Sequence, residues 1–172
     1  MLVIFSGLPG AGKTEIAREL ARQIGATYLR IDTIEQAIRD SAVTRHHLDD
    51  AGYRVAYAVA EENLRIGRAV VADSVNPIPL TRDAWLEVAQ RAQSRSIEIE
   101  IVCSDPNEHR RRIETRTTDI PGLSLPAWSD VVGRDYRLWT REHLVVDTAV
   151  RTPEQNVRLI REALPAPSRG QS

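Results

Sequence analysis

A glycine-rich segment near the start of the chain has the residue types and spacing of a phosphate-binding loop. The sequence GLPGAGKT, residues 7–14, matches the pattern G-x-x-x-x-G-K-[ST] in full. Glycines let the backbone approach a ligand closely, so that successive N–H groups point at an anion. Lys13 supplies a mobile positive charge for the β- and γ-phosphates, and the Thr14 hydroxyl can ligate Mg²⁺. The segment predicts a nucleotide-phosphate site formed by Gly7, Leu8, Pro9, Gly10, Ala11, Gly12, Lys13 and Thr14.

Two aspartates that follow apolar segments could complete this chemistry. Asp73 ends VVAD, where its carboxylate could hold Mg²⁺ or its water shell, or could cap the following turn. The metal role is favoured because the phosphate loop needs an acidic partner nearby. Asp32 ends LRID and could accept the proton of a hydroxyl that attacks the γ-phosphate. Asp32 and Glu35 could instead form a capping box for a helix over 33–42, and both roles can hold together.

A third group of charged residues, EHRRRIETR at 108–116, contains four arginines. On a helix Arg112 and Arg116 would share a face, directly before a loop at 117–126. Two guanidinium groups that swing over the phosphates would neutralise charge that develops during phosphate transfer. The alternative is a solvated helix face with Glu108–Arg112 and Arg110–Glu114 pairs. Both interpretations stay open at this point.

Several other side chains are expected to have structural roles. His46 and His47 are adjacent but lack a third ligand at a helical spacing, so we expect no metal site there. Tyr53 and Tyr57 are four residues apart and are expected to pack together. Arg39 is expected to form a surface salt bridge, with an anionic acceptor as the alternative partner.

The aromatic residues near the end of the chain are expected in the core. Trp128, Val132 and Trp139 approximate one face of a helix over about 127–140, although Trp128 could also line a pocket. Cys103 ends the alternating segment IEIEIVC and is expected to be a buried thiol. A single cysteine excludes an internal disulfide and thiolate metal clusters.

The elements that must position these residues alternate between strands and helices. Apolar patterns predict strands at 2–5, 27–31, 69–73, 97–102 and 143–148. Helices are predicted from about 13, over 33–42, 49–67, 80–94 and 127–140, and from the capped starts DPNE and TPEQ at 105–108 and 152–155. This alternation predicts a parallel five-stranded sheet covered on both faces, in a three-layer α/β/α arrangement. Ligands then bind beyond the carboxyl ends of the strands.

Composition places further bounds on the protein. The 172 residues suit one domain, predicted at 1–164, with a disordered tail at 165–172. Lys+Arg 23 against Asp+Glu 24 gives a net charge of -1, so the chain as a whole does not attract nucleic acid or anionic membranes. No apolar run approaches the roughly 20 residues needed to span a bilayer, and no secretory signal is expected. A cytoplasmic protein, monomeric or homodimeric, is predicted.

The segments GLPGAGKT, LRID, VVADSVN and RRRIETR occur in this order, and together they resemble the P-loop kinases of small molecules. The similarity is greatest to the branch with chloramphenicol phosphotransferase, gluconate kinase and the kinase module of polynucleotide kinases. It spans nearly all of residues 1–164. It implies a P-loop NTPase fold with a sheet of nucleoside-monophosphate-kinase type, strand order 2-3-1-4-5, and an arginine-bearing lid at about 108–125.

The same resemblance implies roles for individual residues, with ATP and Mg²⁺ as the donor. Asp32 matches the base, Asp73 the acid at the end of the third strand, and Arg112 and Arg116 the lid arginines. The segment from Thr148 to residue 150 falls where such kinases hold adenine.

The leading hypothesis is therefore an ATP-dependent phosphotransferase that moves the γ-phosphate to a hydroxyl of a small molecule. The alternatives are a polynucleotide 5′-hydroxyl kinase and a non-catalytic ATP-binding regulatory module. Glu35 stands where polynucleotide kinases commonly carry an arginine. Together with the near-neutral net charge, this argues against a nucleic acid substrate.

Overall fold

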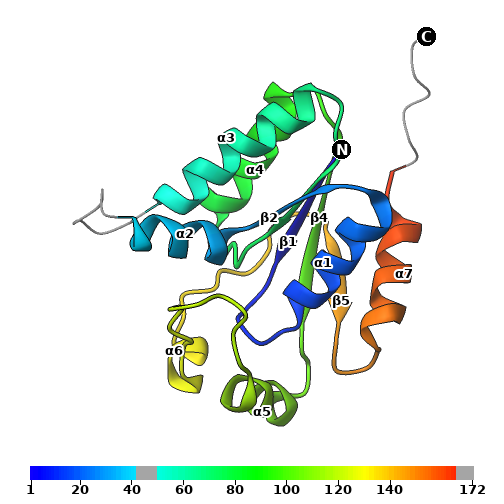
Figure 1. Ribbon diagram of the computed structural model, residues 1–172. Helices are drawn as coiled ribbons and strands as arrows, with labels where there is room; N and C mark the ends of the chain where they lie inside the picture. Colours follow the sequence, from blue (N-terminus) through cyan, green and yellow to red (C-terminus); the bar gives the residue numbers. More distant parts are fainter. Residues whose placement is uncertain (42–49, 166–172) are drawn as a thin grey trace.

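The computed structural model describes residues 1–41 and 50–165, and its centre is a parallel sheet (Figure 1). The strand order is β2-β3-β1-β4-β5, and every neighbouring pair is parallel. This is the expected order, and the three-layer α/β/α fold is confirmed. The strands are β1 (Leu2–Ser6), β2 (Thr27–Arg30), β3 (Val70–Asp73), β4 (Ser96–Val102) and β5 (Leu144–Asp147).

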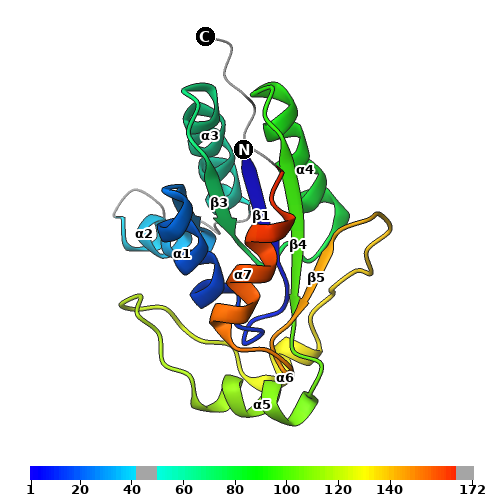
Figure 2. The same ribbon diagram turned by 90° about the vertical axis from the view of Figure 1, so that its right-hand side faces the viewer.

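Helices cover both faces of the sheet (Figure 2). One apolar cluster joins α1 and α7 to one face, and a second joins α3 and α4 to the other. The helices of the described ranges are α1 (Lys13–Ile24), α2 (Ile31–Asp40), α3 (Ala51–Arg65), α4 (Pro79–Arg91), α5 (Pro106–Thr115), α6 (Trp128–Val132) and α7 (Pro153–Ala163).

The central strand β1 explains why a continuous apolar run predicts this sheet. All five of its residues are buried, and their side chains alternate between the two faces. Val3 and Phe5 enter the cluster under α1 and α7, whereas Leu2 and Ile4 enter the cluster under α3 and α4. Because both faces are buried, residues 2–5 are all apolar, and the polar Ser6 comes only at the end of the strand, beside the site.

The register of the strands brings the predicted polar residues to one edge of the sheet. Phe5 of β1 pairs with Asp73 of β3, and Arg30 of β2 pairs with Asp73 from the other side. Because these strands end level, the loop after β1, the start of α2 and the turn after β3 emerge together. This edge is where parallel α/β proteins bind ligands.

One predicted helix is wrong: α6 ends at Val132, and residues 133–143 form no helix. Gly133 is the C-cap of α6, and the segment that follows runs back against α4. There Arg82 donates a hydrogen bond to the carbonyl oxygen of Arg137 in this segment. Val132 is consequently 60% exposed rather than in the core. Trp139 stacks on the ring of His143, so the expected common face does not exist.

Two further expectations, for Cys103 and for a membrane span, can be compared with the structure, and two others cannot. Cys103 is half-buried, because it lies just beyond the end of β4 rather than within it. His46, His47 and residues 166–172 of the predicted tail lie outside the described residues. Within the described part of the chain, no helix is long and apolar enough to cross a membrane.

We predict that Arg82 stabilises this fold strongly. Its buried guanidinium donates to the carbonyl oxygens of Asn76 at 2.9 Å and Arg137 at 2.7 Å, and lies 4.2 Å from the centre of the Trp139 ring. Arg82→Leu leaves the buried carbonyl of Asn76 without this donor and releases the segment at Arg137, and should lower the free energy of unfolding by about 3 kcal/mol in urea titrations. Arg65→Leu is the control, since it removes an exposed pair with Glu61 and should cost less than about 1 kcal/mol. Equal losses in the two variants would contradict this role.

Candidate functional site

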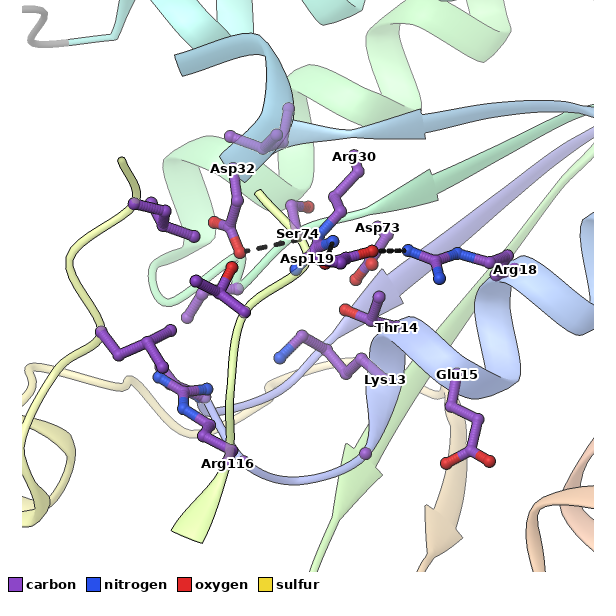
Figure 3. Close-up of a pocket in the computed structure, with 18 of the residues that line it drawn as sticks. Lys13, Thr14, Glu15, Arg18, Arg30, Asp32, Asp73, Ser74, Arg116 and Asp119 are labelled. Carbon is purple, nitrogen blue, oxygen red and sulfur yellow. Dashed lines mark hydrogen bonds and ion pairs between the residues drawn. The ribbon is translucent and has the colours of Figure 1, made fainter. Parts of the chain in front are cut away.

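An open cavity of about 1650 Å³ lies beyond the carboxyl ends of the strands. Its walls come from the phosphate loop, the start of α2, the turn after β3 and the segment after α5. Figure 3 shows Lys13, Asp32 and Arg116 around one space in this cavity, although they belong to different elements. The structure thus brings together the residues that the sequence predicted separately.

The backbone of the glycine-rich segment has the shape that a phosphate loop requires. Gly7 has a φ of +136°, and a Cβ at this position would lie 2.2 Å from the carbonyl oxygen of Ile101. Gly12, with a φ of +92°, is the N-cap of α1, and no described side chain caps this helix. The first N–H groups of α1 therefore face the cavity without a side-chain acceptor, which suits an anion.

Lys13 lies at the base of the cavity and is only 8% exposed. Its Nζ donates a hydrogen bond to the carbonyl oxygen of Leu8 at 2.9 Å. Burial lowers the pKa of Lys13, and the nearby carboxylates of Asp73 and Asp32 oppose this shift. The carboxylates thus favour the charged ammonium that phosphate binding requires.

Asp73 and Thr14 supply oxygen atoms that fit a magnesium ion. The Oδ2 of buried Asp73 accepts a hydrogen bond from the hydroxyl of Tyr28 at 2.7 Å, not from the following turn. Burial and this carboxylate raise the pKa of Tyr28, which keeps the hydroxyl a donor. No group of three or more acidic, histidine or cysteine side chains in residues 1–41 and 50–165 could hold a metal. The Asp73 carboxylate and the Thr14 hydroxyl are only two ligands, which suits Mg²⁺, because this ion usually keeps several waters and takes phosphate oxygens as its other ligands.

Asp32 is not the helix cap that the sequence allowed. The helix α2 begins at Ile31 directly after β2, its N-cap is Arg30, and no described side chain caps it. Because strand and helix join without a connecting turn, the helix starts before the polar residues that suggested a cap. Asp32 therefore lies within the first turn, and its half-exposed carboxylate lies 3.9 Å from the Nε of Arg30.

The two predicted lid arginines have different positions. Arg112 donates to the side-chain and backbone oxygens of Thr148, and Thr148 in turn donates to the carbonyl oxygen of Ala11 at 2.8 Å. Arg112 also forms the expected pair with Glu108, and α5 carries the expected Arg110–Glu114 pair on its exposed side. Arg112 and Thr148 are thus tied to the phosphate loop.

Arg116 does not share a helix face with Arg112, because α5 ends at Thr115. Arg116 begins an extended segment instead, and its side chain lines the cavity. Its buried Nε has no partner among the described residues. Burial lowers the pKa of Arg116, and Asp32 opposes this shift. A half-buried arginine that pairs with no carboxylate in residues 1–41 and 50–165 is available to an anion in the cavity.

Comparison with known families decides the classification. Residues 2–124 match AAA_33, described as an AAA domain. The chain belongs to this family. The matched range includes the phosphate loop, both aspartates and both lid arginines, and ends before Thr148.

Solved structures show that this AAA_33 chain has the fold of P-loop kinases. A candidate kinase from Chloroflexus aurantiacus j-10-fl superposes with a TM-score of 0.72 at 20% identity, covering 95% of this chain and 98% of that one. A sugar kinase from Janibacter sp. HTCC2649 superposes with a TM-score of 0.68 at 17% identity, covering 94% and 92%. Kti12 from Chaetomium thermophilum, in complex with ADP-AlF3, has a TM-score of 0.68 at 20% identity, covering 96% and 100%. The expected resemblance to P-loop kinases is confirmed in the fold.

Curated relatives are similar over a shorter share of their length. The ATPase subunit HslU of an ATP-dependent protease from Bartonella tribocorum (strain CIP 105476 / IBS 506) is 29% identical over 154 residues. The match covers 77% of this chain but 34% of HslU, so the AAA_33 chain spans about a third of the length of the curated relatives it matches.

The sequence analysis missed several residues that line the cavity of the AAA_33 domain. Arg18 lies one helical turn after Thr14, and Arg30 lies two residues before Asp32, so their spacing could have indicated them. Asp119 lies within an irregular segment, where no pattern marks it.

The expected structural roles of Tyr53, Tyr57 and Arg39 are seen, and two of these residues, Tyr53 and Arg39, also line the cavity. Tyr53 and Tyr57 pack with their ring centres 5.9 Å apart, and burial raises the pKa of Tyr53 to about 12. Arg39 forms its salt bridge with Glu35 at 3.2 Å, and burial raises the pKa of Glu35. Tyr53, Arg39 and Glu35 all line the cavity.

We predict that Gly7→Ala abolishes nucleotide binding, because its Cβ cannot coexist with the Ile101 carbonyl unless the loop moves. ADP affinity measured by calorimetry should fall at least about 100-fold, as the loop amides lose their alignment. The matched control is Gly67→Ala. Gly67 also has a positive φ, +81°, but no atom lies within 4 Å of the added Cβ. This variant should bind ADP normally, and equal behaviour of the two would rule out the steric argument.

Proposed function

We propose that this protein is an ATP-dependent phosphotransferase that moves the γ-phosphate to a hydroxyl group of a small molecule. The observation that carries the proposal is the position of Asp32. Its carboxylate lines the same cavity as Lys13 and Arg116 and takes no part in capping its helix. A carboxylate placed in this way can accept a proton, which binding of a nucleotide alone does not require.

The donor half of the site is the phosphate loop and its neighbours. The loop amides, the start of α1 and Lys13 would bind the β- and γ-phosphates of ATP. Thr14 and Asp73 would hold Mg²⁺, which neutralises phosphate charge when bound. Arg112 and Thr148 would support the loop from the nucleotide side through the bond to Ala11.

The acceptor half of the cavity lies beside α2 and α3. Asp32 would accept the proton of the attacking hydroxyl through a carboxylate oxygen, directly or through one water. Tyr53 and Glu35 form the adjoining wall, where a neutral tyrosine hydroxyl and a carboxylate can bind polar groups of the acceptor. The acceptor is proposed to be a small hydroxyl compound rather than a nucleic acid.

The segment after α5 would act as the lid. Arg116 lies at its start and can contact the transferred phosphate, where a guanidinium stabilises developing negative charge. Closure of the lid would also exclude water, which otherwise competes with the acceptor for the phosphate. Proteins with this fold include an APS kinase, CysC of Mycobacterium tuberculosis, solved with AMPPNP and APS. Its complex supports a site that takes a nucleotide together with an acceptor.

We predict that Asp32→Asn lowers phosphate transfer at least about 100-fold while ATP affinity stays within about twofold. The assay measures ADP release across a panel of sugars, nucleosides and aminoglycosides, above the rate without acceptor. The free energy of unfolding should fall modestly, because Asp32 also offsets the buried charge of Lys13, so activity is compared at a temperature where both proteins are folded. ADP release that no acceptor increases would support an ATPase or regulatory module, and full activity of Asp32→Asn would remove Asp32 from the mechanism.

We also predict that Arg116→Ala lowers kcat about 100-fold with little change in the KM for ATP, since its charge acts on the transferring group. Arg110→Ala is the control. Arg110 lies on α5, shortly before this segment, and pairs with Glu114 in solvent, so its loss should leave kcat unchanged. A normal kcat for Arg116→Ala would remove Arg116 from the mechanism.

A further inference from the structure

Two arginines from different elements hold one carboxylate inside the cavity (Figure 3). Arg18 of α1 contacts the Oδ2 of Asp119 at 2.5 Å, and Arg30 at the end of β2 contacts its Oδ1 at 2.6 Å. Each guanidinium therefore binds a different oxygen of the same group. This is the arrangement by which proteins bind carboxylate and phosphate oxyanions.

The two arginines and Asp119 belong to different kinds of structural element. Arg18 lies within α1, and Arg30 lies at the junction of β2 and α2 with a side chain only 12% exposed. Asp119 belongs to the irregular segment 117–126. Among the described residues, Asp119 is the only side chain of this segment that hydrogen-bonds to another element, and it accepts from both arginines. Regular elements set the backbone positions of both arginines, although the side chain of Arg18 is 54% exposed, whereas the carboxylate belongs to an irregular segment and can be exchanged.

The charges in the cavity indicate that the two arginines would need another negatively charged partner if Asp119 moved away. Burial is the largest influence on the pKa of Arg30 and lowers it, but the bond to Asp119 together with the electrostatic effects of Asp119, Tyr28 and Asp73 raises it overall. The same bonds, from Arg30 first and then Arg18, hold the pKa of Asp119 well below its usual range. Asp32 lies 3.9 Å from Arg30, and Asp73 is hydrogen-bonded to Tyr28. Without Asp119, the half-buried guanidinium of Arg30 would keep only part of the negative charge that offsets its burial. This favours binding of another anion.

We propose that Arg18 and Arg30 form a binding site for an oxyanion, a carboxylate or phosphate substituent of the acceptor, and that Asp119 competes for it. Binding of the substituent would release segment 117–126 from α1 and β2. The assignment to the acceptor rests on the proposed phosphotransfer, but the oxyanion site itself does not. A terminal phosphate of the nucleotide is the other source of the same chemistry.

The test uses inorganic phosphate as the probe, titrated by calorimetry at constant ionic strength into protein saturated with ADP and Mg²⁺. ADP fills the α- and β-phosphate positions, and any phosphate that binds at the vacant γ-position beside Lys13 and Arg116 is recognised because it persists in Arg30→Gln. Asp119→Asn should bind phosphate about tenfold more tightly than the unchanged protein, because the competing charge is gone. The double variant Asp119→Asn with Arg30→Gln should lose this gain.

The matched control is Asp135→Asn. Asp135 also pairs with an arginine, Arg137, at 2.7 Å and is 64% exposed, but it does not line the cavity. Phosphate affinity should not change in this variant. Equal phosphate affinity of Asp119→Asn and the unchanged protein, or a gain that survives Arg30→Gln, would overturn the proposal.

A second measurement does not depend on any variant. Phosphate added to the ADP-loaded protein should increase hydrogen exchange of the backbone amides in 117–126, since it displaces Asp119. Unchanged exchange at saturating phosphate would contradict the competition.

Arg30→Gln distinguishes an oxyanion of the acceptor from a terminal phosphate of the nucleotide. If the oxyanion belongs to the acceptor, the ratio of ATP affinity to ADP affinity should be the same in this variant as in the unchanged protein. A lowered ratio would assign the site to the nucleotide and overturn the assignment to the acceptor. Because none of these measurements involves transfer, their failure and the failure of the acceptor assay are distinguishable.

Discussion

A buried lysine is the constraint on which the site depends. Burying an isolated ammonium costs several kcal/mol unless opposite charge lies nearby. Lys13 is 8% exposed, and its compensation comes from Asp73 at the end of β3 and Asp32 at the start of α2. These carboxylates reach Lys13 only because β1, β2 and β3 end level at one edge of the sheet. The strand register and the charge of the phosphate loop therefore support each other.

The same constraint explains how much of the fold could be predicted. The apolar run at residues 2–5 allows one interpretation, a strand buried on both faces, and β1 has that position. The glycine pattern before Lys13 requires a strand before it and a helix after it, which fixes two more elements. Local sequence determines these parts because burial and backbone geometry act within a few residues.

Predictions failed where distant contacts override local patterns. The helical pattern at 127–140 ends at Val132, because Gly133 stops the helix and Arg82 of α4 binds the carbonyl groups that follow. The capping pattern of Asp32 and Glu35 is likewise overridden, since β2 continues into α2 without a turn. Asp119 shows the limit most clearly: its partners Arg18 and Arg30 are 101 and 89 residues away in sequence. No periodicity connects residues so far apart.

The division between rigid and movable groups unites the donor site, the lid and the oxyanion site. Lys13, Arg18 and Arg30 lie on a helix or at the end of a strand packed in the core, whereas Arg116 and Asp119 lie on one segment between α5 and α6. Movement of that segment would bring the charge of Arg116 to the phosphates or remove the charge of Asp119 from the two arginines. A single displacement would thus change the electrostatics of both halves of the cavity. Coupling of this kind needs no rearrangement of the sheet, because the fixed cations already face the cavity.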